Sequence, residues 1–117
     1  MEIRELVHAI LDGDLLTARQ WVADAQRSRM QWKSIPYPRE FSGRELAVAA
    51  AVAELLARRA GVEPPQWTES VGAVPTPLLL DPGLDQMPRS YALARSAGPE
   101  PFRKRNLVAL PDFLDVA

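Results

Sequence analysis

Residues 41–61 read FSGRELAVAAAVAELLARRAG, and this stretch decides the fold. Its body is rich in Ala, Leu and Val and predicts one long helix. Ser42 and Glu45 have the spacing of a capping box at its start. Gly61 stands where a Schellman motif would end it. Because apolar side chains surround most of its circumference, this helix needs neighbours on most sides.

The faces of this helix differ in side-chain size when residues are placed about 100° apart. One face carries bulky residues: Val48, Val52, Leu55 and Leu56. A second face is mostly alanine, and small side chains allow a neighbouring helix to approach closely. That neighbour can belong to the same chain or to a second copy in a homodimer. The strip expected to face water comprises Ala47, Ala51, Glu54 and Arg58.

Two shorter helices are predicted before this one. Apolar residues between Ile3 and Leu11 recur at the i, i+3, i+4 and i+7 positions of an amphipathic helix. Gly13 ends that helix, and Asp14 caps a second helix that runs to about Met30. We therefore expect an all-α, mainly helical fold with a three-helix core from the first 61 residues.

Proline divides the chain into two parts, since nine of the eleven prolines lie at or after Pro64. Residues 62–117 are therefore cut into short pieces. They are too apolar for a disordered tail, so we interpret them as a wrapping segment of short helices. Leu78–Leu80 and Leu107–Leu110 are either loops or the two strands of a small ribbon. The whole chain, 1–117, is expected to form a single domain.

The composition is that of a soluble globular protein and argues against several classes of protein, such as secreted and membrane-spanning proteins. Fourteen Lys and Arg balance fifteen Asp and Glu, giving a net charge of −1, which argues against nucleic acid or an anionic membrane as the partner. The chain has no cysteine, which fits a reducing cytoplasm. The amino terminus does not resemble a signal peptide, and no apolar run is long enough to span a membrane. We expect a cytoplasmic protein.

The search for catalytic chemistry assigns no residue. His8 is the single histidine and has no nearby nucleophile in the sequence. Two aspartate pairs, Asp81 with Asp85 and Asp112 with Asp115, have spacings more typical of turns and caps than of an acid–base pair. We expect no metal and no cofactor, because a second histidine, cysteines and a glycine-rich phosphate loop are all lacking. An enzyme stays open as an alternative without assigned residues.

The most suggestive polar cluster is Arg103, Lys104, Arg105 and Asn106. Adjacent cations can bind a phosphate or an acidic surface, and arginine adds bidentate geometry. The alternative is a solvated helix end whose cations complement the helix dipole. A helix-turn-helix reading of the first two helices is disfavoured, because the second begins Leu15-Leu16-Thr17, where base readers need polar or basic side chains.

Three aromatic residues, Trp32, Tyr37 and Trp67, lie in or near the proline-containing connections. We expect exposed aromatic surface around them. Large aromatic side chains are enriched in protein–protein interfaces, so these residues are candidates for an interaction surface.

Four segments carry a resemblance to known proteins: residues 13–16, 18–22, 65–69 and 102–107. Together they resemble a group of small uncharacterised bacterial proteins. The later half is also similar to the C-terminal region of helix-turn-helix regulators associated with bacterial toxin–antitoxin loci. In those regulators a separate DNA-binding domain comes first, and this chain has no room for one. The resemblance implies the partner-binding half of such a protein and brings no catalytic residues.

Two functions are compatible with these observations. The first is a non-catalytic protein-interaction module, antitoxin-like or a regulatory subunit, whose partner is another protein or a second copy of itself. The second is a small binder of a phosphate-bearing ligand or nucleic acid through Arg103, Lys104 and Arg105.

Overall fold

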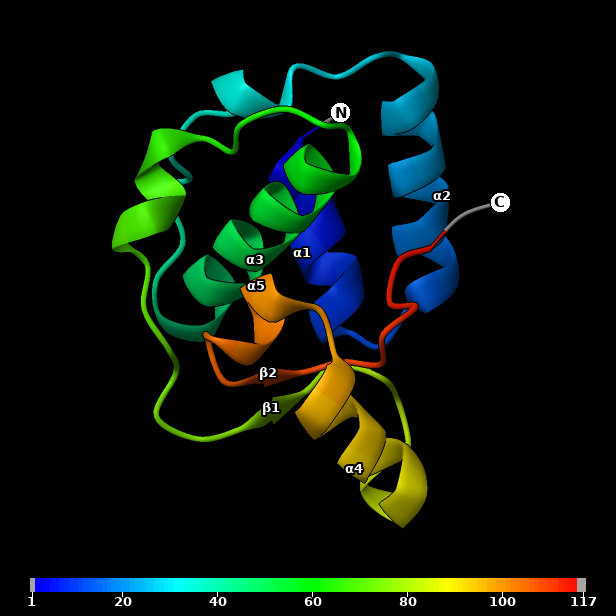
Figure 1. Cartoon of the computed structure of the whole chain (residues 1–117). Coiled ribbons are helices and arrows are strands. Elements are labelled where there is room, and N and C mark those ends of the chain that lie inside the picture. Colours follow the sequence, from blue (N-terminus) through cyan, green and yellow to red (C-terminus); the bar gives the residue numbers. More distant parts are fainter. Residues whose placement is uncertain (1, 116–117) are drawn as a thin grey trace.

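The computed structural model describes residues 2–115 and is mainly helical, as the sequence predicts. The first half forms three helices: α1 (Ile3–Leu11), α2 (Leu15–Arg27) and α3 (Gly43–Arg59), with a short 3-10 helix at Trp32–Ser34. The second half forms two more 3-10 helices (Gln66–Ser70, Leu84–Gln86), two strands, β1 (Leu78–Leu79) and β2 (Leu107–Val108), and helices α4 (Pro88–Ala97) and α5 (Glu100–Arg103). Figure 1 shows α1 and α5 beside α3, whereas α4 extends away from the bundle.

The C-terminal end of α3 has the predicted geometry. Gly61 has a φ of 73°, in the left-handed region that glycine adopts without steric cost. Val62 donates its N–H to the carbonyl of Ala57, and Gly61 donates to that of Arg58, both at 3.0 Å. These two bonds define a Schellman motif, so the predicted ending is confirmed.

The start of α3 differs from the prediction. Ser42 is the N-cap residue, but its side chain makes no capping hydrogen bond. The Glu45 carboxylate lies instead 3.9 Å from His8 Nε2 on α1. The Ser42 side chain does not close the helix start, so the predicted capping box is wrong.

The side of α3 that was expected to face water is also mostly covered. Ala47, Ala51 and Glu54 are buried, and only Arg58 of the four is exposed. The cause is non-local, because α5 and the 3-10 helix at Gln66–Ser70 pack against α3. The second half therefore wraps the helix, as predicted, but it also closes the strip that periodicity alone assigned to solvent.

The alanine face of α3 has its neighbours within the same chain. Ala49, Ala50, Ala53 and Ala57 are fully buried in the single chain. A second copy could reach them only if the fold opened. The expectation of a homodimer through this face is therefore wrong.

The two short strands pair, which confirms the ribbon. They are parallel, with Leu78 opposite Leu107 and Leu79 opposite Val108. Leu80 extends the contact by donating its N–H to the Val108 carbonyl at 2.9 Å. Parallel strands need a long crossover connection. Here α4 and α5 lie between the two strands in the chain and return it to the end of the sheet at which β1 begins.

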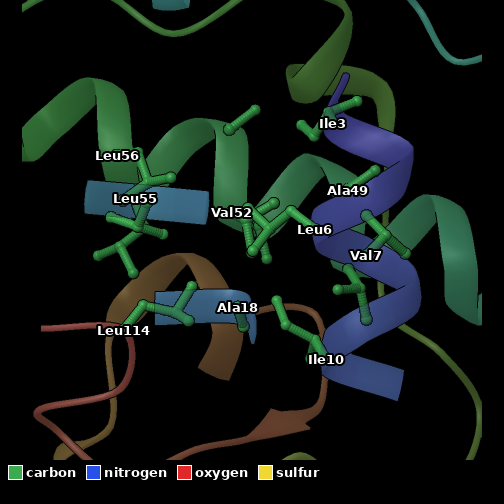
Figure 2. Close-up of a cluster of buried hydrophobic side chains, with 14 of the residues drawn as sticks. Ile3, Leu6, Val7, Ile10, Ala18, Ala49, Val52, Leu55, Leu56 and Leu114 are labelled. Atoms are coloured by element: carbon green, nitrogen blue, oxygen red, sulfur yellow. The ribbon is translucent and has the colours of Figure 1, made fainter. Parts of the chain in front are cut away.

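One hydrophobic core joins both halves of the chain. Figure 2 shows side chains of α1 and α3 packed with Ala18 of α2 and with Leu114 from the C-terminal segment. Other buried residues of the second half join the same cluster: Leu80, Phe102, Leu107 and Phe113. A smaller cluster of Leu84, Ala94 and Val108 anchors α4. None of the helices within residues 2–115 has the length and apolar character needed to cross a membrane.

Candidate functional site

The predicted basic cluster is divided by the fold into two sides. Lys104 and Arg105 turn toward α3, whereas Arg103 lies with Asn106 near the end of α4. The turn after α5 makes this division, since Asn106 has a φ of 63° and its N–H bonds the Arg103 carbonyl at 3.0 Å. Asparagine tolerates this left-handed conformation. The four residues therefore do not form one continuous ligand-binding surface.

Arg105 is a buried structural residue with 1% of its surface exposed. Its guanidinium donates to the carbonyl oxygens of Thr68 (2.8 Å), Val71 (3.1 Å) and Pro101 (2.8 Å). It also pairs with Glu54, with 3.0 Å between Nη1 and Oε1. These contacts join the turn after α5 to α3 and to the segment at Thr68 and Val71 that follows α3. The expectation that Arg105 shares an accessible cationic patch is corrected by its burial.

Glu54 is the carboxylate on which the cations converge. Besides Arg105, its Oε2 lies 2.8 Å from Lys104 Nζ and 2.5 Å from Arg58 Nη2. Burial acts to raise the pKa of Glu54, but the hydrogen bonds and charges of Lys104 and Arg105 outweigh it and hold the pKa below its ordinary value. This carboxylate is therefore ionised at neutral pH. Sequence periodicity missed this centre because two of its three partners, Lys104 and Arg105, lie about fifty residues further along the chain.

The other side of the cluster forms a small polar pocket of about 100 Å³. Arg103 donates through Nε to the Gly98 carbonyl at 2.6 Å, which fixes its side chain at the end of α4. Arg95 Nη1 lies 3.5 Å from Asn106 Oδ1. The Asn106 amide is held in turn by the Val74 carbonyl, with 3.1 Å to Nδ2. Arg95 lies on the preceding helix, so its place beside Asn106 could not be found from the sequence.

The three candidate aromatic residues have different environments. Trp32 is buried, with its ring centroid 6.3 Å from that of Trp21, so the expectation that it is exposed is wrong. Trp67 is half-buried, and its indole N–H donates to the Ile35 carbonyl at 2.8 Å. Tyr37 is 46% exposed and meets Trp67 edge to face at 5.7 Å. Tyr37 and Trp67 are thus brought together, whereas Trp32 belongs to the core.

Tyr37 borders an open groove of about 600 Å³. The apolar residues that line it come from three separate parts of the chain: Ile3, Met30, Ile35, Pro36, Tyr37 and Pro38. Glu2, Arg4 and Glu40 form its polar rim. Only the Tyr37 segment could be found from the sequence, because Ile3 and Met30 join it through folding. We call this feature the Tyr37 groove.

The other titratable candidates take part in local or tertiary contacts. Asp81 accepts the Leu110 N–H at 2.8 Å, and burial raises the pKa of this carboxyl although that hydrogen bond acts against it. Asp115 pairs with Arg59 at 2.9 Å. Within residues 2–115, acidic residues and His8 form no group of three that could hold a metal ion.

The chain was compared with protein-family models, curated proteins and solved structures, and none of them matches it.

Proposed function

We propose that this protein is an interaction module that binds an apolar segment of another protein in the Tyr37 groove. The observation that carries the proposal is an exposed aromatic side chain on a rigid frame. Tyr37 stands between Pro36 and Pro38, whose rings restrict the backbone. Trp67 supports its ring edge to face. A preorganised aromatic residue loses little conformational entropy when a partner binds.

The shape and lining of the groove favour a segment of chain as the occupant. A volume of about 600 Å³ is large enough for several side chains. Most of its lining residues are apolar, so the energy of binding would come from burial of the partner's apolar side chains. Tyrosine is one of the residue types that are enriched in binding hot spots.

The rim charges favour a partner segment that carries basic residues. Arg4 is 2.5 Å from the Glu2 carboxylate, so its charge is already compensated. Glu40 is exposed and has no ion-pair partner among residues 2–115. The rim is therefore acidic on balance, and complementary charge would guide the encounter and the orientation of the partner.

An antitoxin-like or regulatory subunit of the cytoplasm is the biological role that we propose for this module. It rests on the resemblance of residues 65–69 and 102–107 to the partner-binding region of toxin–antitoxin-associated regulators. Of these segments, Trp67 supports the Tyr37 groove directly. Arg105 holds the surrounding segments in place from inside the fold.

The experiment is an affinity capture that compares matched surface variants. Wild type, Tyr37→Ala and Leu93→Ala are each used to capture proteins from extracts of the native host, followed by quantitative mass spectrometry. Leu93 is exposed on α4, away from the lining of the groove, and serves as the control. We expect a partner that wild type and Leu93→Ala retain and that Tyr37→Ala binds about 30-fold more weakly, as for a hot-spot loss of about 2 kcal/mol.

Two results would contradict this function. One is the absence of any captured protein whose recovery depends on Tyr37. The other is an equal loss of the partner with Leu93→Ala, which would show that the loss is not specific to the Tyr37 groove. Circular dichroism of both variants checks that the fold is intact.

A further inference from the structure

We propose a second binding site, for a phosphoryl group, in the pocket formed by Arg95, Arg103 and Asn106 at the junction of α4 and α5. It is separate from the Tyr37 groove, and none of its lining residues belongs to that groove. The site lies on the side of the basic cluster that the buried Glu54 network does not use.

Two arginines without carboxylate partners line this pocket. Within residues 2–115, neither Arg95 nor Arg103 has an acidic side chain at ion-pair distance. By contrast, Lys104 and Arg105, which are their neighbours in sequence or space, pair with Glu54. Positive charge is therefore left uncompensated at one pocket, where an anion would be attracted.

The side chains of Arg103 and Asn106 are held in position before any ligand arrives. Arg103 uses only Nε for its bond to the Gly98 carbonyl, which leaves its Nη groups for a ligand. Asn106 is fixed through Val74 and faces Arg95 with its amide oxygen. The buried Arg105 anchors the turn between Arg103 and Asn106. Such preorganisation lowers the entropic cost of binding.

Pocket size and donor chemistry point to a phosphoryl group. The pocket has a volume of about 100 Å³, against about 600 Å³ for the Tyr37 groove. This suits a compact group such as phosphate rather than a whole nucleotide. Guanidinium groups bind phosphate oxygens through paired, charge-assisted hydrogen bonds, and two guanidinium charges balance a phosphate dianion.

The test is an NMR titration of the full chain with sodium phosphate, against sodium chloride at the same ionic strength. We expect saturable shifts of the Arg95 and Arg103 side-chain N–H signals and of the Asn106 amide. Arg95→Ala and Arg103→Ala should each weaken phosphate binding by about tenfold or more. Arg89→Ala removes an exposed arginine from the same helix, outside the pocket, and should leave binding unchanged.

A parallel titration with phenyl phosphate distinguishes two sources of the same group. Tighter binding of the monoester would indicate a larger ligand that extends out of the pocket, and equal binding would indicate the free ion. If Arg103→Ala loosens α4, Arg95→Ala still tests the proposal. The contact of Arg95 with Asn106 is long, so its removal should leave the fold intact. The proposal is overturned if chloride gives the same shifts, if neither phosphate binds, or if Arg95→Ala binds as wild type does.

Discussion

Glu54 is the residue whose environment depends most on the rest of the molecule. It lies on α3 and has 4% of its surface exposed. Two of its three cationic partners, Lys104 and Arg105, come from the second half of the chain. A buried ion pair is costly to form, and removal of one member leaves the other charge uncompensated. Glu54 thus gives the turn after α5 a specific position against α3, in addition to the hydrophobic contacts between them.

The ionisation of Glu54 predicts how stability depends on pH. Because its pKa is lower in the folded chain than in the unfolded chain, its contribution is fully present above the unfolded value and is lost as pH falls through the folded value. At neutral pH we expect Glu54→Gln to lower the free energy of unfolding by about 3 kcal/mol, since Arg105 stays buried. Urea unfolding at pH values from neutral to acid measures this difference.

The matched control is Glu63→Gln, which changes an exposed glutamate 3.4 Å from Lys33. An exposed pair contributes about 0–1 kcal/mol, so this variant should unfold nearly as wild type does. The difference in the free energy of unfolding between wild type and Glu54→Gln should become smaller in acid. A gap that stays constant over this pH range would show that the carboxylate charge is not what stabilises the fold.

At the scale of elements, local sequence signals predicted where a helix ends better than periodicity predicted which of its faces are exposed. The ending of α3 at Gly61 depends on a local backbone conformation, and the structure has it. The capping box at Ser42 is absent, and Gly43, the first residue of the helix, has a φ of 57°, which the Ser42–Glu45 spacing does not show. The prediction of a solvent-exposed strip on α3 was also wrong. Periodicity shows which residues share a face of a helix, but it does not show which face a distant segment covers.

A single glycine sets how closely α4 approaches β2. Gly98 follows α4, and a Cβ added there would overlap the backbone oxygens of Ala94 and Ala109. Its φ of −60° is ordinary, so the constraint is space rather than backbone conformation. Gly98→Ala should therefore push the helix end away from the strand, at a cost of about 1–3 kcal/mol. The midpoint of urea unfolding measures the loss.

Gly72→Ala is the control for this substitution, because no heavy atom outside its chain neighbours lies within 4 Å of the added Cβ. It should leave the unfolding midpoint unchanged or raise it slightly, since alanine restricts the unfolded chain more than glycine. If the two alanine variants unfold alike, the approach of α4 to β2 is not close-packed at Gly98.

At the scale of the whole molecule, the sequence predicted the class of fold better than the candidate sites. Helical periodicity and proline placement are properties of neighbouring residues, and they predicted the helical first half and the wrapping second half. The Tyr37 groove and the Arg95 pocket each join residues that folding brings together. For Arg103, Lys104 and Arg105, adjacency in sequence was misleading, because the turn sends them to opposite sides.

The shared core predicts that the first half does not fold alone. Phe102, Phe113 and Leu114 belong to the same core as α1 and α3. Removal of residues 62–117 would expose that core and would take from Glu54 its partners Lys104 and Arg105. A chain of residues 1–61 should therefore lack cooperative thermal unfolding by circular dichroism and bind hydrophobic dyes. Addition of residues 62–117 as a separate peptide should restore the transition. A sharp transition in the short chain alone would instead make the second half an accessory covering.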